Sequence, residues 1–388
     1  MRSPRPTRSW CPDLSPFFFN PFFLQERAAA VNIPLSLAPA LSDYKGPGGM
    51  PGDALPLGLR GAHQATNASL AVSLAGAFEG WAATHGGDLP SGTAPPGAAD
   101  RAAALVAGTL PPEYAVGLAR CAWHGRAEVV HDGDDASATA ATSALSFYLD
   151  GAHTPESMET CAHWFASEVG GEEEAGAGAG AGGGSGGGAA NGNGAAATTP
   201  AASPATPGPT GDVRLLLFNC MHERDPRRLL TPLTDTLRAR GAPLAGALFV
   251  PPDSSYASLG PAEEAKVDLS WQHSLQAVWA DLAAAGAGSA AQRGGGGGGP
   301  GARLPPLPPL PLSPGRAAMA VASPSAAAQD AAAGAVSPSV KSAIDWLRSA
   351  SKARPGVRLR VLVTGSLYLV GDVLRHLGRA EEGGSGAE

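Results

Sequence analysis

The 388-residue sequence lacks long hydrophobic runs, paired cysteines and concentrated positive charge, and each absence excludes a class of protein. The phenylalanine-rich stretch 17–23 is interrupted by Asn20 and Pro21, so no run reaches the length of a transmembrane helix. The net charge is −7 at pH 7 and no basic stripe occurs, which argues against a nucleic-acid-binding surface. We therefore expect neither a membrane span nor a nucleic-acid partner.

The cysteines show no C-x-x-C spacing, which argues against a zinc site or a disulfide framework. Their apolar surroundings favour reduced, buried thiols and an intracellular protein, with cytosol, mitochondrion and plastid all left open. The segment 220–222 has no metal-ligand spacing either, so we expect no metal site on this chain. The four cysteines are Cys11, Cys121, Cys161 and Cys220.

The 53 glycines and 36 prolines are clustered, so much of the chain cannot form a packed core. Three segments, 86–100, 171–210 and 283–336, have too little apolar content to offset their chain entropy, and we expect disorder there. The last contains six consecutive glycines and a proline run ending at Pro314. That run could serve as a polyproline ligand, but a solvated loop is favoured.

Between these segments, strands alternate with helices, a pattern typical of parallel pairing with right-handed crossovers. The stretch 213–218 is wholly apolar, as in a strand buried on both faces. The sequence therefore predicts an α/β fold with a doubly wound, mostly parallel sheet. The expected strands are 145–150, 213–218, 246–250 and 359–364. The expected helices between and after them are 155–169, one starting at Pro226, 271–282, 338–350 and 367–377.

An earlier helix is expected at 63–81, and its buried side is expected to carry Leu70, Leu74, Phe78 and Trp81.

The stretch 148–157 joins a predicted strand to a predicted helix. Asp150 ends the strand, and Thr154 with Pro155 has the pattern of an N-cap followed by a first-turn proline. Asp150 and His153 are thus presented where open α/β sheets bind ligands, and they could contact a ribose or a phosphate. The alternative, favoured by these residues taken alone, is a capped junction whose polar side chains satisfy backbone groups.

Six motifs occur in an order that resembles folylpolyglutamate synthases, which are ATP-dependent amide ligases of the Mur ligase type. Each motif alone is weak, but the ordered set is specific, and it covers mainly the C-terminal domain of that family. His124 stands where the family usually has proline. The motifs are 61–68 (Gly-Ala-His-Gln-Ala-Thr-Asn-Ala), 123–126 (Trp-His-Gly-Arg), 148–157, Phe218-Asn219 with 224–226 (Arg-Asp-Pro), Trp271-Gln272, and 363–371.

The resemblance implies that ATP activates the γ-carboxyl of a folate polyglutamate as an acyl phosphate, which the amine of L-glutamate then attacks. It also implies Mg²⁺ on the phosphates and a monomeric enzyme. Dihydrofolate synthase activity and a non-catalytic nucleotide-binding relic of the ligase stay open as alternatives. By resemblance, Arg126 would contact ATP phosphate, Asp150 the ribose, Asn67 and His153 the neighbourhood of the nucleotide, and Ser366 the glutamate, while no catalytic residue is assigned.

One departure from the family is large, because no G-x-x-x-x-G-K-[ST] motif occurs in the 388 residues. The glycine-rich tracts lack the lysine, and no strand leads them into a helix. We therefore expect an incomplete ligase that is inactive alone, with the phosphate loop and magnesium ligands on an absent N-terminal domain. The predicted division is a remnant of that domain at 1–62, an interdomain helix and connecting segment at 63–135, and a glutamate-binding α/β domain at 136–388.

Overall fold

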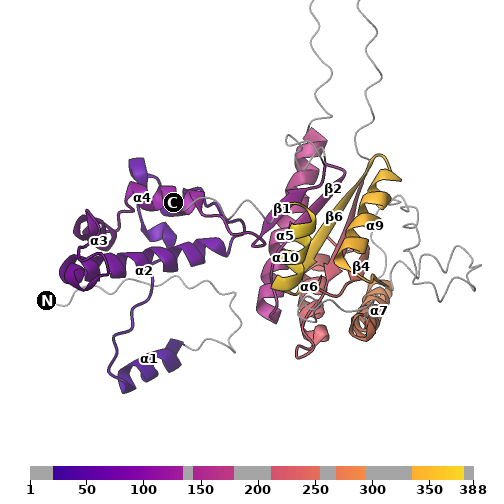
Figure 1. The fold of residues 1–388 in the computed structure, drawn as a ribbon, viewed down its shortest axis with the longest axis horizontal. Helices are drawn as coiled ribbons and strands as arrows, with labels where there is room; N and C mark the ends of the chain where they lie inside the picture. The colour runs from indigo at the N-terminus through magenta and orange to yellow at the C-terminus, as the bar shows by residue number, and fades with distance from the viewer. Residues whose placement is uncertain (1–20, 134–142, 179–210, 254–267, 293–333, 380–388) are drawn as a thin grey trace, which may run out of the picture. The chain divides into compact units, whose positions relative to one another are not determined.

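The protein was analysed as a computed structural model that describes residues 21–133, 143–178, 211–253, 268–292 and 334–379 (Figure 1). It contains two compact units, one formed by Met1–Leu55 and Ala65–Val116 and the other by Pro56–Gln64 and Gly117–Glu388. This division differs from the predicted boundaries at 62 and 135. The second unit resumes at Gly117, inside helix α4 (Pro112–Arg120), and also contains strand β1 (Glu128–His131), which lies before residue 135.

The second unit is built on a six-stranded sheet of order β1-β2-β6-β3-β4-β5. Strand β1 pairs antiparallel with β2, and every other neighbouring pair is parallel, which confirms the predicted mostly parallel sheet. The remaining strands are β2 (Leu145–Leu149), β3 (Gly211–Phe218), β4 (Gly246–Phe249), β5 (Ala335–Val336) and β6 (Val357–Thr364).

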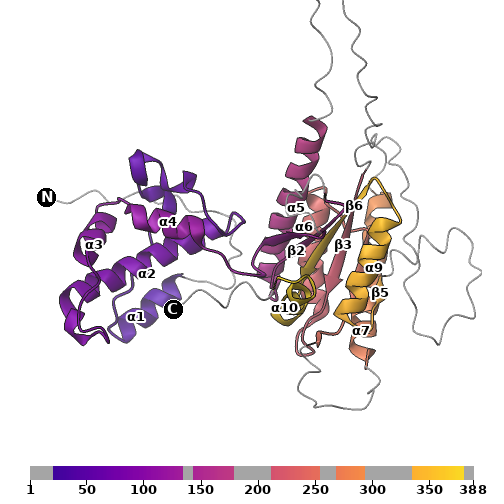
Figure 2. The ribbon, with the colours of Figure 1, turned by 45° about the horizontal axis from the view of Figure 1, so that its top comes forward.

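Helices cover both faces of this sheet, as the doubly wound prediction requires (Figure 2). Successive strand side chains point to opposite faces, so a wholly apolar strand contributes to two cores. Tyr148 packs with the helices on one face, and its neighbour Phe147 packs with those on the other. The first face carries α5 (Pro155–Gly178), α6 (Pro226–Ala239) and α7 (Ser270–Gln292), and the second carries α9 (Val340–Lys352) and α10 (Leu367–His376).

Helix α6 shows how the sequence determines a local element. The Asp225 carboxylate accepts a hydrogen bond from the Arg227 N–H at 2.9 Å, and Pro226 occupies the first turn. The leucines at helical spacing face inward, as predicted, and all are buried. These four residues are Leu229, Leu230, Leu233 and Leu237.

The expected disordered segments differ partly from the structure. Residues 86–100 are described, with a short 3-10 helix at Gly86–Asp88 and the start of α3 (Ala98–Val106). Helices α5 and α7 continue into 171–210 and 283–336, because alanine and glutamate favour a helix. Most of the remainder of both segments lies outside the described residues. The sequence did not predict strand β5, because two residues give no periodic signal. Its pairing with β4 places the end of segment 283–336 in the sheet.

Removing residues 179–210 and 293–333 and closing each gap with a short Gly/Ser linker is expected to preserve a cooperative melting transition. Loop-closure cost changes only slowly with length, so the midpoint should stay within a few degrees. A matched deletion of 283–336 removes β5 and the end of α7 as well and should lower the midpoint, because β5 pairs with β4 and the Gly334 carbonyl accepts a hydrogen bond from the Gln276 side chain at 3.0 Å. Calorimetry on the two variants checks this, and equal midpoints would contradict the role given to β5.

The first unit contains α1 (Pro21–Ala30), α2 (Gln64–His85) apart from its first residue, α3 and the first half of α4, with 3-10 helices at Leu41–Asp43, Pro47–Gly49 and Gly52–Ala54. Residues 33–40, which follow α1, form no regular element. None of the helices in the described ranges combines the length and apolar character that crossing a membrane requires.

The predicted buried side of α2 is wrong. Its four large residues are exposed, and the covered face of the helix consists of small and medium residues such as Ala68, Val72 and Ala82. A 3.6-residue period identifies an apolar face but does not say which face the rest of the unit covers. Small residues allow a close approach here, since a Cβ on Gly76 would lie 2.7 Å from Leu105 of α3. The exposed residues are Leu70 (53%), Leu74 (62%), Phe78 (49%) and Trp81 (44%).

Candidate functional site

The motif residues that follow β2, β3 and β6 meet at one edge of the sheet, where these parallel strands end. The Asp150 N–H donates to the Val363 carbonyl at 3.1 Å, and the Gly365 N–H donates to the Ala152 carbonyl at 2.9 Å. Gly365 has φ +97°, and a Cβ there would lie 2.3 Å from the Asn219 carbonyl oxygen, so only glycine fits. The structure thus brings three of the six motifs together at the edge where open α/β sheets bind ligands.

Asp150 joins two loops at this edge. One carboxylate oxygen accepts from the Ala127 N–H at 3.0 Å and the other accepts from the Ala152 N–H at 2.9 Å. The residue is only 5% exposed, and burial raises the pKa of its carboxyl, an effect opposed by the Ala127 N–H and by the Arg126 charge. The Asp150 side chain therefore satisfies backbone N–H groups at the strand-to-helix junction, as the capped-junction interpretation predicts. It leaves each oxygen with further lone pairs and does not exclude a ribose contact.

The loop that carries Arg126 is fixed on both sides of that residue. Gly125 has φ +73°, and its N–H donates to the Glu128 carboxylate at 2.7 Å while its carbonyl accepts from Gly151 at 3.1 Å. Ala127 is held at φ +48°, an uncommon value for a residue with a side chain, by its bond to Asp150. The Arg126 side chain itself is exposed, and no hydrogen-bond partner for it occurs among the described residues. A fixed loop thus carries an exposed guanidinium that has no hydrogen-bond partner among the described residues.

His63 lies beside this pair of charges, although it was not among the predicted site residues. Burial lowers the pKa of its imidazole, the Asp150 carboxylate opposes this, and the Arg126 charge lowers the pKa further. Its Nε2 lies 2.9 Å from the Gln64 amide nitrogen, so the neutral ring accepts a hydrogen bond there. The sequence signal was present, because His63 belongs to the first motif, but nothing in the sequence joined residue 63 to residues 126 and 150.

His153 is held by its own turn. Its Nδ1 lies 2.8 Å from the Gly151 carbonyl, and its own carbonyl accepts from the Arg224 guanidinium at 2.5 Å. Thr154 Oγ1 accepts from the Ser157 N–H at 3.3 Å, which confirms the predicted N-cap of α5. The structure therefore places His153 at the same edge as Asp150, with its ring orientation fixed by a backbone contact.

The Phe-Asn and Arg-Asp-Pro motifs have structural contacts of their own. The side-chain amides of Asn219 and Gln272 hydrogen-bond across 3.1 Å, and both residues are buried. The Trp271 indole N–H donates to the Cys220 carbonyl at 2.7 Å. Together with the Arg224 contact to His153, these bonds attach the loop after β3 to α7 and to the β2–α5 turn. Residues from distant parts of the chain thus support the edge that carries the candidate site.

Ser366 and Asn67 occupy helix starts. Ser366 is the buried N-cap residue of α10, and its side chain makes no capping hydrogen bond, so the first N–H groups of that helix stay available to a ligand. Asn67 lies exposed in the first turn of α2. It belongs to the first unit, and its predicted place beside the nucleotide therefore stays a prediction.

The thiols agree only in part with the expectation of four buried cysteines. Cys161 and Cys220 are free and buried, and burial raises the pKa of Cys220 to about 12 and that of Cys161 well above its usual range. Cys121 is exposed, and Cys11 lies outside the described residues. Within the described ranges, no group of three or more His, Cys, Asp or Glu residues could hold a metal ion.

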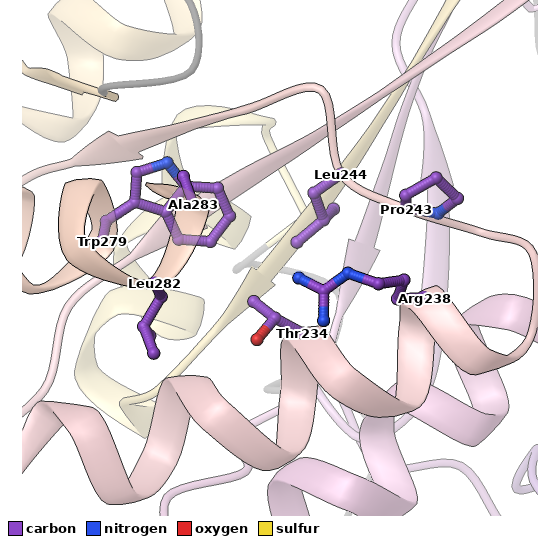
Figure 3. A pocket seen from close by; sticks show the side chains of 7 residues that line it. All are labelled: Thr234, Arg238, Pro243, Leu244, Trp279, Leu282 and Ala283. Carbon is purple, nitrogen blue, oxygen red and sulfur yellow. The ribbon is translucent and has the colours of Figure 1, made fainter. Parts of the chain in front are cut away.

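A cavity of about 210 Å³ lies between α6 and α7, where Thr234 and Arg238 face Trp279 (Figure 3). None of its lining residues comes from the six motifs. The Thr234 hydroxyl donates to the Leu230 carbonyl at 2.9 Å, and Arg238 is paired with Asp235 at 2.7 Å. Its polar groups thus already have partners within the chain, and the candidate site remains the sheet edge.

Comparison with known proteins identifies the same relatives as the motifs. No family model matches the chain. Two folylpolyglutamate synthases from Arabidopsis thaliana are 33% and 34% identical over 368 and 326 residues, covering 92% and 82% of this chain but 52% and 46% of their own lengths. A mitochondrial folylpolyglutamate synthase from Homo sapiens is 31% identical over 213 residues, 53% of this chain and 27% of that protein.

Among solved structures, Mycobacterium tuberculosis folylpolyglutamate synthase complexed with ADP and AMPPCP matches with a TM-score of 0.38 at 14% identity. The match covers 86% of this chain and 44% of that chain. The chain spans about half the length of the curated relatives that it matches. Over most of its own length, the chain is homologous to the folylpolyglutamate synthases, as its motifs indicated.

Proposed function

We propose that this chain contributes the nucleotide-contacting and glutamate-binding part of an ATP-dependent ligase that adds L-glutamate to the γ-carboxyl of folate polyglutamates. The observation that carries the proposal is the 33% identity over 92% of the chain to folylpolyglutamate synthase, combined with motif residues gathered at one sheet edge. In this reaction the carboxylate attacks the γ-phosphorus of ATP and releases ADP. The glutamate amine then attacks the acyl phosphate, losing a proton as inorganic phosphate leaves.

The geometry supports a role for Arg126 on phosphate. Its guanidinium is exposed, lacks a partner among the described residues, and is carried by a loop fixed through Gly125 and Ala127. A guanidinium binds phosphate oxygens through a rigid fork of donors, and a fixed loop lowers the entropy cost of using it. The rings of His63 and His153 are each held by a hydrogen bond to a neighbouring residue, and they are suited to orient a ribose or base beside it.

For the glutamate, the start of α10 is the best-supported place. Its N-terminal N–H groups and the Ser366 hydroxyl are not joined in a cap, and a helix N-terminus favours a carboxylate. By contrast, Thr154 and Asp225 side chains already occupy the starts of α5 and α6. The amino-acid substrate is therefore assigned to α10 and the nucleotide to the Arg126 loop.

The purified chain alone is expected to show no glutamate-dependent ADP release and at most weak ATP binding, because its sequence holds no phosphate loop. Each missing charge-assisted contact costs about 1.5–3 kcal/mol of binding. ADP release should appear when the chain is combined with a phosphate-loop-bearing portion of a folylpolyglutamate synthase. Coupled ADP assays with and without folate, glutamate and this portion check the proposal.

Two outcomes would contradict it. Turnover by the chain alone would show that the phosphate contacts come from residues assigned no such role. ATP binding without any turnover in the combined preparation would favour a non-catalytic nucleotide-binding module.

A further inference from the structure

A tight turn just before β1 carries Arg126. The Arg126 N–H donates to the Trp123 carbonyl at 3.1 Å, and Gly125, the third residue of the turn, has φ +73°. His124 does not have a positive φ, so the turn is of type II rather than type I′. A Cβ on Gly125 would lie 2.4 Å from a Val370 methyl group, so the turn packs directly on α10.

Glu128, the first residue of β1, contacts this turn with both carboxylate oxygens. One oxygen accepts from the Gly125 N–H at 2.7 Å, and the other lies 3.2 Å from Nδ1 of His124. The His124 side chain is 53% exposed, and an ion pair this accessible to water contributes little. Gly125 is buried, and a hydrogen bond from its N–H to a carboxylate is stronger than a neutral one. The bond to Gly125 is therefore the main link between Glu128 and the turn.

Arg126 thus lies between two carboxylates that bind the backbone on either side of it. Glu128 accepts from the preceding residue, Gly125, and Asp150 accepts from the following residue, Ala127, at 3.0 Å. The N–H of Arg126 itself is bonded within the turn, so these contacts determine the direction of its Cα–Cβ bond. Only the rotations of the side chain remain free, which lowers the entropy lost when the guanidinium binds a ligand.

We propose that Glu128 is a positioning residue that fixes Arg126 for contact with a phosphate of ATP. Its carboxylate holds the turn that presents the guanidinium, and Glu128 itself touches no substrate. The inference rests on the proposed function for the identity of the ligand that Arg126 binds. It requires a hydrogen-bond acceptor at position 128 rather than a negative charge, because the amide oxygen of a glutamine can also accept from Gly125.

Amide hydrogen exchange on the full chain tests the contact independently of activity. Glu128→Ala removes the acceptor of the Gly125 N–H, so exchange at Gly125 should become at least about tenfold faster. Glu128→Gln keeps an acceptor and should stay within about threefold of wild type, and it remains informative if the alanine variant folds poorly. Unchanged Gly125 exchange in Glu128→Ala would overturn the proposal.

Glu159→Ala is the matched control for the loss of a glutamate. Glu159 lies 3.9 Å from His163 at the same four-residue spacing, but it binds no backbone N–H among the described residues. It belongs to α5 and none of the motif contacts involves it, so this substitution should change neither Gly125 exchange nor ATP binding.

ATP affinity shows whether Glu128 acts through Arg126. In a preparation completed with a phosphate-loop-bearing portion of a folylpolyglutamate synthase, Glu128→Ala should weaken ATP binding at least about tenfold and leave the KM for glutamate within about twofold. The same substitution should have little further effect on ATP binding in an Arg126→Ala background, a dependence that a merely structural role would not produce. A full effect in that background would overturn the proposal, as would a Glu128→Gln variant as impaired as the alanine variant.

Failure of this inference and failure of the proposed function give different results. Coupling between Glu128 and Arg126 in ATP affinity, without any turnover, would contradict the ligase function and support the positioning role. Glutamate-dependent turnover without that coupling would leave the ligase function in place and overturn the positioning role.

Discussion

Replacing Asp150 with alanine is expected to destabilise the second unit by about 2–5 kcal/mol, because two buried N–H groups lose their acceptor. These donors belong to Ala127 and Ala152, which are both almost inaccessible to water, so solvent cannot replace the carboxylate. Chemical denaturation of the full chain, monitored by fluorescence, measures the change.

Asp225→Ala is the matched control, since Asp225 also accepts one backbone N–H but at an exposed helix start. Loss of such a cap costs about 1 kcal/mol. If the two substitutions had equal effects, the buried bonds of Asp150 would not have the importance given to them. Asp150→Asn keeps one acceptor oxygen and should fall between wild type and alanine.

The pH dependence gives a second signature of Asp150. Burial raises the pKa of its carboxyl in the folded state above the unfolded value, so the native state binds the proton more tightly. The stability that this linkage contributes is present below the unfolded pKa and is lost as pH rises through the folded pKa. Asp150→Asn removes this slope, and the difference between the two stability–pH curves isolates it.

Much of the second unit could be predicted because its signals are local. Strands β2, β3, β4 and β6 are apolar runs, and α6 has its cap, proline and leucine face within fifteen consecutive residues. Strands β1 and β5 were missed because four and two residues at the sheet edges carry no readable period. The prediction for the buried face of α2 was wrong because it assumed that the large residues of the helix point inward, as they usually do. The local sequence does not show which face of a helix other elements cover, and in the described unit the face with the large residues is exposed.

The candidate site was predictable in its location but not in its contacts. The strand-to-helix turn at 150–155 indicated where Asp150 and His153 would lie, and the structure confirms that position. The bond from Ala127 to Asp150 spans 23 residues, and the proximity of His63 spans many more. Such contacts depend on how the chain returns to the sheet edge. No periodic pattern encodes them, and only the ordered motifs suggested that these segments act together.

Arg126→Ala is expected to lower glutamate-dependent ADP release at least about a hundredfold in a ligase completed with a phosphate-loop-bearing portion. Groups that stabilise developing charge on transferring phosphates contribute effects of this size. The melting temperature should stay nearly unchanged, because the Arg126 side chain is exposed and no contact with it holds the fold among the described residues.

Arg240→Ala is the matched control for charge, since Arg240 is also exposed but lies at the C-terminal end of α6, outside all six motifs. Its removal should leave the rate within about twofold, whereas Arg126→Lys should recover only part of the loss, because lysine keeps the charge but not the two-pronged geometry.

Combining the Arg126 and Asp150 substitutions tests whether the two residues act together. If Asp150 acts on the nucleotide mainly by fixing the Ala127 turn, Asp150→Ala in an Arg126→Ala background should reduce the rate far less than it does alone. An unchanged rate for Arg126→Ala would remove the nucleotide from this loop and leave the capped junction as the sole role of Asp150.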